Sequence, residues 1–193
     1  GVFMNVLRPT LAIFSLLTLL CGVAYPFVIS GNGTLAFPSQ VEGSLIIRDG
    51  KTVGSALIGQ SFTAPEYFWG RPSATGPMAN NAGASSGSNQ GPLNPALIDN
   101  IKARMNALRA VDPDNRLPIP VDLVTASASG LDPDISLAAA FYQVGRIARE
   151  RQVGEANVRQ LIEANQQQPW LGFLGEPRVN VLTLNLALDQ LEN

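Results

Sequence analysis

An uncharged apolar run near the start of the chain places the first constraint on the fold. Residues 10–29 read TLAIFSLLTLLCGVAYPFVI and contain no charged side chain. As an α-helix, such a run extends about 30 Å, which matches the hydrocarbon core of a bilayer. We therefore predict a transmembrane helix over residues 10–29, with Pro26 kinking or ending its last turn, and one folded domain over residues 30–193.

The flanking charges predict how this helix is oriented. Arg8 precedes the run, and the next basic residue is Arg48. Because positive side chains close to a span stay in the cytoplasm, residues 1–9 are expected to be cytoplasmic and the domain extracytoplasmic. A cleaved signal peptide is the alternative, but the bulky residues 25–27, YPF, stand where cleavage requires small side chains. A retained anchor is favoured.

Small side chains follow one side of the predicted span. Ala12, Ser15, Thr18 and Gly22 fall within an arc of about 120° at the helical period of 3.6 residues per turn. Small and hydroxyl residues allow two helices to approach closely in lipid. The pattern predicts packing against a helix of another protein, with chance placement in a leucine-rich helix as the alternative.

The composition excludes several classes of protein. Only 15% of the 193 residues are charged, the formal net charge is −2, and the chain has no histidine and a single cysteine, Cys21. A nucleic-acid partner is not indicated, because such proteins present a basic surface. Histidine-dependent catalytic triads and histidine-ligated zinc are excluded, and Cys21 has no intrachain disulfide partner. We expect no catalytic residue, no metal and no cofactor bound by this chain.

Local signals predict a mixed domain after the span. Residues 31–36, GNGTLA, are expected to form a flexible linker. Asp49-Gly50 between the apolar segments 44–48 and 52–58 predicts a β-hairpin, because Asp-Gly favours the positive φ angles of a type I′ turn. The overall class is α+β: one N-terminal transmembrane helix followed by a single helix-rich extracytoplasmic domain with a small β-hairpin or sheet.

Apolar spacing predicts several helices in the second half of the chain. The first begins at the cap Asn94-Pro95, the second begins at Ser136, and the third covers Glu155–Asn165. Residues 181–191 fit both a strand and a helix, and we favour the helix. The side chains expected on buried helix faces are Leu97, Ile98, Ile101, Met105, Leu108, Leu137, Phe141, Val144, Ala148, Val158, Leu161 and Ile162.

Residues 73–92, SATGPMANNAGASSGSNQGP, predict a long surface loop. They carry no charge and a single large apolar side chain, Met78, so they cannot form a core of their own. Loops of this length in compact domains are usually functional or disordered, and we expect this one to order against a partner. Residues 83–87 match the G-x-S-x-G elbow of serine hydrolases, but the chain lacks a histidine base and the segment lacks a preceding strand, so a chance match is favoured.

A hydroxyl-rich segment, residues 125–130, precedes Asp132-Pro133-Asp134. Its hydroxyls and carboxylates could line a site for a cation or a polar ligand. The same residue types also form turns and helix caps, and we favour that interpretation.

Taken together, these segments resemble the C subunit of the bacterial Kdp-type potassium-transporting ATPase. The similarity extends from Leu7 almost to the end of the chain. It is carried by blocks in a fixed order: residues 7–9 (LRP), 54–62 (GSALIGQSF), 67–75 (YFWGRPSAT), 86–89 (SGSN), 123–132 (LVTASASGLD) and 179–189 (VNVLTLNLALD).

The resemblance implies a non-catalytic accessory subunit in a bacterial plasma membrane. Its implied partners are a channel-like K⁺-selective subunit, a P-type ATPase subunit and a small membrane peptide, and ATP, Mg²⁺ and K⁺ act at those partners. Its implied roles are to stabilise the assembly and to raise the apparent ATP affinity of the pump subunit. A membrane-anchored binding module and a serine hydrolase remain the alternatives. The expected partner contacts are Arg71, Ser73, Thr75, Ser86 and Asn89.

Overall fold

The structure, a computed structural model, describes residues 2–191, and the chain divides into two compact units between Leu45 and Ile46. The first unit is almost entirely helical. It consists of α1 (Val2–Leu19), a π-helical turn (Leu20–Ala24), α2 (Tyr25–Ala36) and α3 (Pro38–Val41). Within the described residues, Asn5–Ala36 is the one helix that is long and apolar enough to cross a membrane, and it contains the predicted span.

The helix continues through Pro26, where we had expected a kink or an end. A proline has no N–H and its ring clashes with the carbonyl four residues earlier in an α-helix. Here the π-helical turn precedes Pro26, and the N–H of Tyr25 donates to the carbonyl of Leu20, five residues back. The wider turn accommodates the proline without ending the helix.

The predicted flexible linker over residues 31–36 is wrong, because these residues are the last turns of α2. The side chains of Asn32 and Thr34 donate to the carbonyls of Val28 and Ser30, four residues earlier, at 2.7 and 2.9 Å. These polar residues thereby satisfy the helix backbone instead of opening it.

The predicted β-hairpin is confirmed. β1 (Leu45–Arg48) pairs with β2 (Lys51–Ser55), and the turn residues Asp49 and Gly50 have φ angles of 51° and 74°. The second strand ends three residues before the predicted Ile58, because the chain turns at Ser55, whose carbonyl accepts the N–H of Ile58 at 3.3 Å.

Most of the predicted helices are present. They are α4 (Pro95–Val111), α7 (Glu155–Asn165) and α8 (Val181–Leu188), which ends three residues before the predicted Leu191. The helix predicted from Ser136 is two helices, α5 (Leu137–Tyr142) and α6 (Val144–Arg151), separated at Gln143. Ser136 caps α5 as expected, since its hydroxyl accepts the N–H of Ala139 at 3.0 Å.

A three-stranded antiparallel sheet completes the second unit. Its order is β3 (Asp134–Ser136), β5 (Arg178–Asn180) and β4 (Gln166–Gln167), with Ile135 and Gln166 both opposite Val179. The α+β class is therefore confirmed. Strands this short contain no alternation of apolar and polar residues, so this sheet was not predicted.

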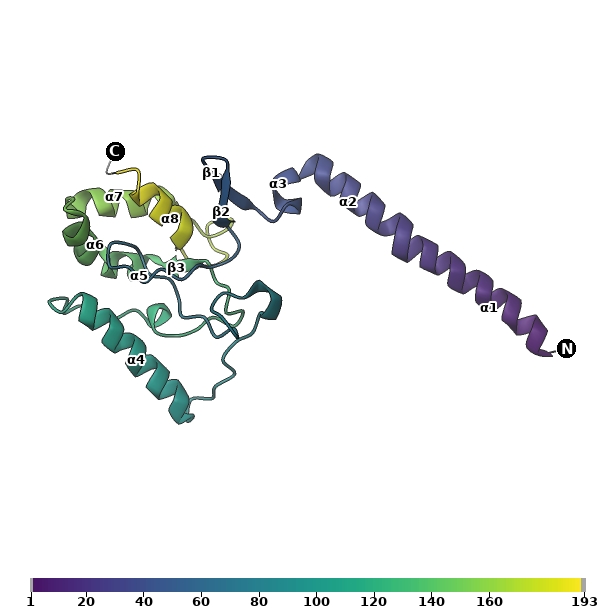
Figure 1. The fold of residues 1–193 in the computed structure, drawn as a ribbon, viewed down its shortest axis with the longest axis horizontal. Coiled ribbons are helices and arrows are strands. Elements are labelled where there is room, and N and C mark those ends of the chain that lie inside the picture. Colours follow the sequence, from purple (N-terminus) through teal and green to yellow (C-terminus); the bar gives the residue numbers. More distant parts are fainter. Residues whose placement is uncertain (1, 192–193) are drawn as a thin grey trace. The chain divides into compact units, whose positions relative to one another are not determined.

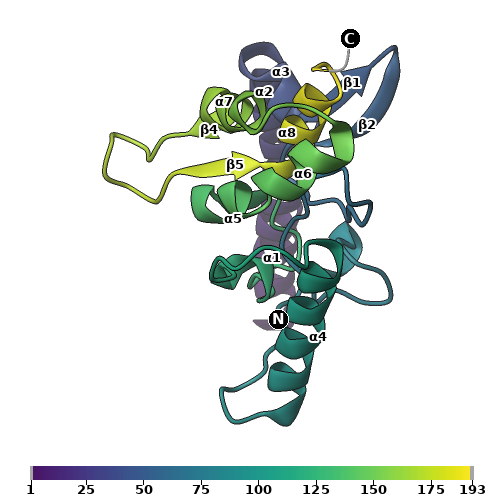
Figure 2. The ribbon, with the colours of Figure 1, turned by 90° about the vertical axis from the view of Figure 1, so that its left-hand side faces the viewer.

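The core of the second unit lies among α5, α6, α7, α8 and β5, which are gathered together in Figures 1 and 2. Helix α4 lies to one side of them and is buried only at Leu108. The prediction that Ile98 would be inward is wrong, because 45% of its surface is exposed. The fully buried side chains of the unit include Phe68, Leu108, Leu123, Ile135, Val144, Ile147, Val158, Ile162, Val179, Leu184 and Leu188.

Candidate partner-contact surface

An irregular segment, residues 64–71, crosses the core without helix or strand structure, although Phe68 and Trp69 are 0% and 5% exposed. Side chains replace the missing backbone partners. The Trp69 N–H donates to Oε1 of Gln143 at 2.8 Å, and Nε2 of Gln143 donates to the Trp69 carbonyl at 3.1 Å. Gln143 makes these bonds from the break between α5 and α6, and Asn185 of α8 pairs with Phe68 in the same way.

Two arginines lie over the indole of Trp69. The guanidinium carbons of Arg104 and Arg146 lie 5.1 and 5.2 Å from its ring centroid. Arg146 also donates to the carbonyls of Pro65 and Tyr67, and Arg104 donates to that of Gly70. Burial lowers the pKa of both guanidinium groups, that of Arg146 to about 10.

Arg71, the last residue of segment 64–71, is one of the predicted contact residues. Its side chain bonds inside the domain. Its guanidinium forms a 2.9 Å salt bridge with Asp132 and donates to the carbonyls of Thr125 and Ala126 at 3.4 and 3.2 Å. Its side chain is 25% exposed. Arg71 therefore joins segment 64–71 to the hydroxyl-rich segment 125–130 and to Asp132, which follows it.

The uncharged loop 73–92 lies on this hydroxyl-rich segment. The Ser73 hydroxyl donates to the Gly130 carbonyl at 2.6 Å, and the Ser86 N–H and the Ser85 hydroxyl donate to the Ser129 carbonyl at 2.9 and 3.0 Å. The loop is thus ordered by hydrogen bonds within the chain itself. Hydroxyl-to-backbone bonds take the place of the apolar contacts that its sequence cannot supply.

Ser73 and Thr75 close the first turn of the loop. Their hydroxyls accept the N–H groups of Asn80 and Asn81 at 2.8 and 3.0 Å, and the Thr75 hydroxyl donates to the Met78 carbonyl at 2.7 Å. Both residues are half-buried. These two predicted contact residues shape the loop from within.

Ser86 and Asn89, the remaining predicted contact residues, lie on the exposed part of the loop. The Ser86 hydroxyl donates to the carbonyl of its neighbour Gly87 at 3.0 Å, and Asn89 has a φ of 51°. Arg71, Ser73 and Thr75 therefore bond within the domain, whereas Ser86 and Asn89 are exposed on the loop. Their contact with a partner stays a prediction.

The hydroxyl-rich segment uses its own side chains to form turns. The Ser127 and Ser129 hydroxyls accept the N–H groups of Gly130 and Leu131 at 2.9 and 3.1 Å, and Asp132 accepts that of Asp134 at 3.1 Å. This agrees with the turn interpretation. Within residues 2–191, no group of three or more His, Cys, Asp or Glu side chains is placed to hold a metal ion.

The serine-hydrolase motif lacks the required local structure. A single 3-10 turn, Ala82–Ala84, stands where the elbow needs a strand, and irregular chain follows Ser85 where it needs a helix. The Ser85 hydroxyl donates to a backbone carbonyl. The chance match that we favoured agrees with this geometry.

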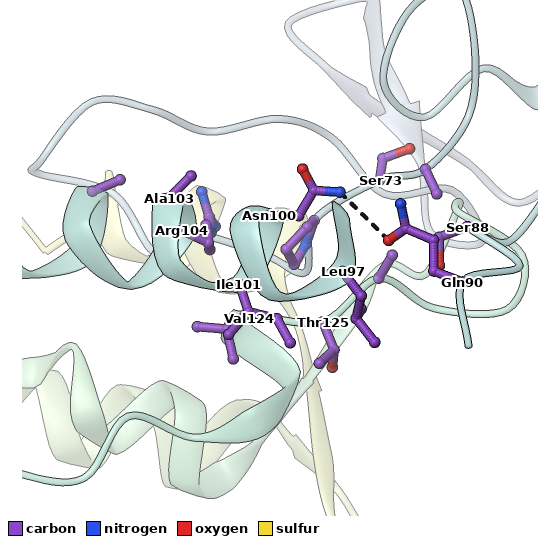
Figure 3. A pocket seen from close by; sticks show the side chains of 14 residues that line it. Ser73, Ser88, Gln90, Leu97, Asn100, Ile101, Ala103, Arg104, Val124 and Thr125 are labelled. Carbon is purple, nitrogen blue, oxygen red and sulfur yellow. Dashed lines mark hydrogen bonds between the residues drawn. The ribbon is translucent and has the colours of Figure 1, made fainter. Parts of the chain in front are cut away.

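A cavity of about 430 Å³ opens where the loop, α4 and the hydroxyl-rich segment meet. Figure 3 shows Ser73, Ser88 and Gln90 on the loop side, facing Leu97, Asn100, Ile101 and Arg104 of α4. A 3.4 Å hydrogen bond from Asn100 to Gln90 joins the two sides (Figure 3). The sequence signals for α4 and the loop were separate, and neither predicted that they would enclose a cavity.

The predicted helix-packing residues are divided between two kinds of helix. Ala12, Ser15 and Thr18 lie in α1, whereas Gly22 lies in the π-helical turn. The predicted arc assumed a constant 3.6-residue turn, and a π-helical turn has a longer one. The position of Gly22 around the helix axis therefore differs from the one that a constant 3.6-residue turn predicts. The packing of this face against a partner stays a prediction.

The chain combines one long apolar helix with one folded unit. The family model described as the K⁺-transporting ATPase c chain, KdpC, matches residues 7–190. The chain belongs to the KdpC family. Family membership makes it a subunit associated with potassium transport, in agreement with the resemblance.

Close relatives support the same membership. The chain is 63% identical over 183 residues to the potassium-transporting ATPase KdpC subunit of Janthinobacterium sp. (strain Marseille), covering 95% of this chain and 97% of the relative. It is 64% identical over 186 residues to that of Herminiimonas arsenicoxydans, covering 96% and 98%. It is 64% identical over 188 residues to that of Polaromonas naphthalenivorans (strain CJ2), covering 97% and 96%.

Proposed function

We propose that this chain is a non-catalytic accessory subunit that stabilises the assembly of an ATP-driven potassium uptake complex. Its partners are a channel-like K⁺-selective subunit, a P-type ATPase subunit and a small membrane peptide. ATP, Mg²⁺ and K⁺ act at those partners, and no nucleic acid is involved. The observation that carries the proposal is the KdpC family match over residues 7–190.

The proposed arrangement is a single-pass protein of the bacterial plasma membrane, with residues 1–9 cytoplasmic and the domain outside. The Asn5–Ala36 helix supplies a candidate span, and Arg8 lies near its start while the next basic residue is Arg48. This charge distribution favours a cytoplasmic N-terminus. The helix binds the membrane parts of the partners, and the domain binds parts that extend outside.

We further propose that any effect on ATP affinity is indirect. A domain outside the membrane has no access to cytosolic nucleotide. It can change the apparent ATP affinity only by binding one conformation of the complex more tightly than another, which shifts the equilibrium between them. The largest shift available equals the difference between those two binding free energies.

Co-purification tests the accessory role. The chain is tagged in its native membrane, extracted in mild detergent, and its partners are identified by mass spectrometry. Stoichiometric recovery of a P-type ATPase subunit and a channel-like subunit, with K⁺-stimulated ATPase activity, is the expected result. Recovery of this chain alone, together with unchanged activity after its deletion, would contradict the proposal.

The contact surface needs variants that leave the interior unchanged. Ser86→Arg with Asn89→Arg places two large cations on the exposed part of the loop, and we expect partner recovery to fall. The matched control is Lys102→Ala with Asn106→Ala on exposed positions of α4. Arg71→Ala is less informative, because Arg71 also bonds Asp132 and the carbonyls of the hydroxyl-rich segment.

A further inference from the structure

The turn between β4 and β5 exposes a continuous group of large apolar side chains. Trp170, Leu171, Phe173 and Leu174 are 71%, 67%, 72% and 46% exposed. Figure 2 shows this turn extending away from the helices of the domain. Single exposed apolar residues are common, but a contiguous group on a protruding turn usually marks an interaction site. We refer to residues 170–174 as the apolar tip.

The apolar tip is held in one shape before any contact is made. The Trp170 N–H donates to the Leu174 carbonyl at 3.0 Å, and the Leu174 N–H donates to the Trp170 carbonyl at 2.9 Å. Leu171 and Gly172 turn the chain with φ angles of 54° and 81°. A turn already fixed in this way loses little conformational entropy on binding, so more of the contact energy contributes to affinity.

The apolar tip continues directly into the core. β5 leads from it to Val179, which is fully buried, and then to Asn180, whose side chain caps α8 by accepting the Thr183 N–H at 3.0 Å. The tip is therefore joined through β5 to the buried centre of the domain. This suits a contact that orients the whole domain.

We propose that the apolar tip docks into an apolar cleft on another protein subunit of the same potassium-transporting complex, on the side of the membrane where this domain lies. The inference rests on the proposed function. Four side chains are too few for a stable interface by themselves, which needs about 800 Å² per partner. The tip fits a partner that is also bound elsewhere, for which a small added contact raises the overall affinity.

The charges around the tip favour a protein over a lipid surface. Segments that bind bacterial or other anionic membranes usually place several Lys or Arg beside their apolar residues. Between residues 166 and 178 the charged residues are Glu176 and Arg178, and Arg178 forms a 2.7 Å salt bridge with Asp134. Trp and Phe in an uncharged turn match the anchor residues of protein interfaces.

Site-specific crosslinking in the purified complex tests this proposal. Cys21→Ser removes the single natural cysteine, and Phe173→Cys then receives a benzophenone maleimide. Leu117→Cys, at a position that is 60% exposed in the loop after α4, is the matched control. We expect position 173 to crosslink to one identified protein subunit of the complex, and position 117 to give at most a tenth of that product.

A double variant gives an independent readout. Trp170→Ser with Phe173→Ser should lower partner retention after dilution on the order of tenfold, because aromatic anchors carry a large share of interface energy. Crosslinking of position 173 to lipid alone, or to nothing while the partners co-purify, overturns the inference and leaves the accessory role intact. Absence of the partners from the wild-type preparation overturns both.

Discussion

The side-chain amide of Asn185 bonds both backbone groups of Phe68, although the two residues are 117 positions apart in the sequence. The Phe68 N–H donates to Oδ1 at 2.8 Å, and Nδ2 donates to the Phe68 carbonyl at 3.0 Å. Together with Gln143 at Trp69, Asn185 gives an irregular segment the hydrogen bonding of a strand. This is why residues 64–71 can cross the core without belonging to a sheet.

Replacing Asn185 tests this role. Asn185→Leu leaves the buried N–H and carbonyl of Phe68 without partners, and we expect the free energy of unfolding to fall by about 2–4 kcal/mol. Urea unfolding of the full chain in detergent, followed by circular dichroism, measures the change. Asn106→Ala on the exposed face of α4 is the control and should stay within about 0.5 kcal/mol of wild type. An equal effect of both variants would contradict the argument.

Arg146 gives a second stability prediction. Arg146 is 2% exposed, and its guanidinium donates to Gln143 at 2.6 Å and to the carbonyls of Pro65 and Tyr67. Arg146→Met keeps the apolar stem but removes every donor, so we expect a loss of about 3 kcal/mol. Arg159→Met, at a half-exposed arginine with a 3.5 Å salt bridge to Glu155, should cost less than about 1 kcal/mol. Pulse proteolysis in urea compares the two.

The absence of a side chain at Gly130 allows the uncharged loop to lie close against the hydroxyl-rich segment. Its φ is 67°, and a Cβ there would lie 2.6 Å from the Ser86 carbonyl oxygen and 2.7 Å from Cγ2 of Thr75. Gly130→Ala should displace the loop, cost about 1–3 kcal/mol, and speed cleavage of residues 73–92 by proteinase K. Gly91→Ala, with open space around its Cβ, is the control. Unchanged cleavage in Gly130→Ala would show that the loop is held elsewhere.

Asp134 predicts a pH dependence of stability. Burial raises its pKa above the usual 3.8, Arg178 opposes the shift, and Asp132 adds to it, while the buried Oδ1 has no hydrogen-bond partner in the described residues. A carboxyl with a raised pKa binds its proton more readily when folded. Its contribution to stability is therefore present below the unfolded pKa and is lost as pH rises through the folded one.

The variant Asp134→Asn tests the pH-dependent contribution of the Asp134 carboxyl to stability. The stability of wild type relative to Asp134→Asn should increase as the pH is lowered from 7 towards 4, measured by urea unfolding at each pH. Asp99→Asn, on an exposed position of α4, corrects for the loss of one negative charge. A relative stability that falls over the same interval would reverse the sign and refute the assignment.

Local sequence signals were sufficient to predict where two helices begin and where the hairpin turns. Asn94-Pro95 and Ser136 started their helices as predicted, and Asp49-Gly50 formed the hairpin turn. Each of these depends on the conformational preference of one or two residues. The spacing of Val158 and Ile162 likewise identified the buried face of α7.

The remaining features depend on residues far apart in the chain. At the break between α5 and α6 the amide of Gln143 bonds Trp69, 74 positions away, which no local pattern around residue 143 reveals. β3 and β5 have three residues each, too few to show alternation. The hydrogen bonds that hold loop 73–92 on residues 125–130 join residues 57 and 44 positions apart, so no local pattern predicts them. The apolar tip was not singled out either, because exposure of its side chains depends on how the whole domain packs.

The positions of the two tryptophans give the protein two separate optical reporters. Trp69 is 5% exposed, with two guanidinium groups near its ring, whereas Trp170 is 71% exposed in the turn between β4 and β5. Fluorescence from Trp69 should respond to opening of the domain, and acrylamide quenching of Trp170 should respond to whatever covers the turn. A single Trp170→Phe variant separates the two signals, so folding and docking can be followed in the same unlabelled chain.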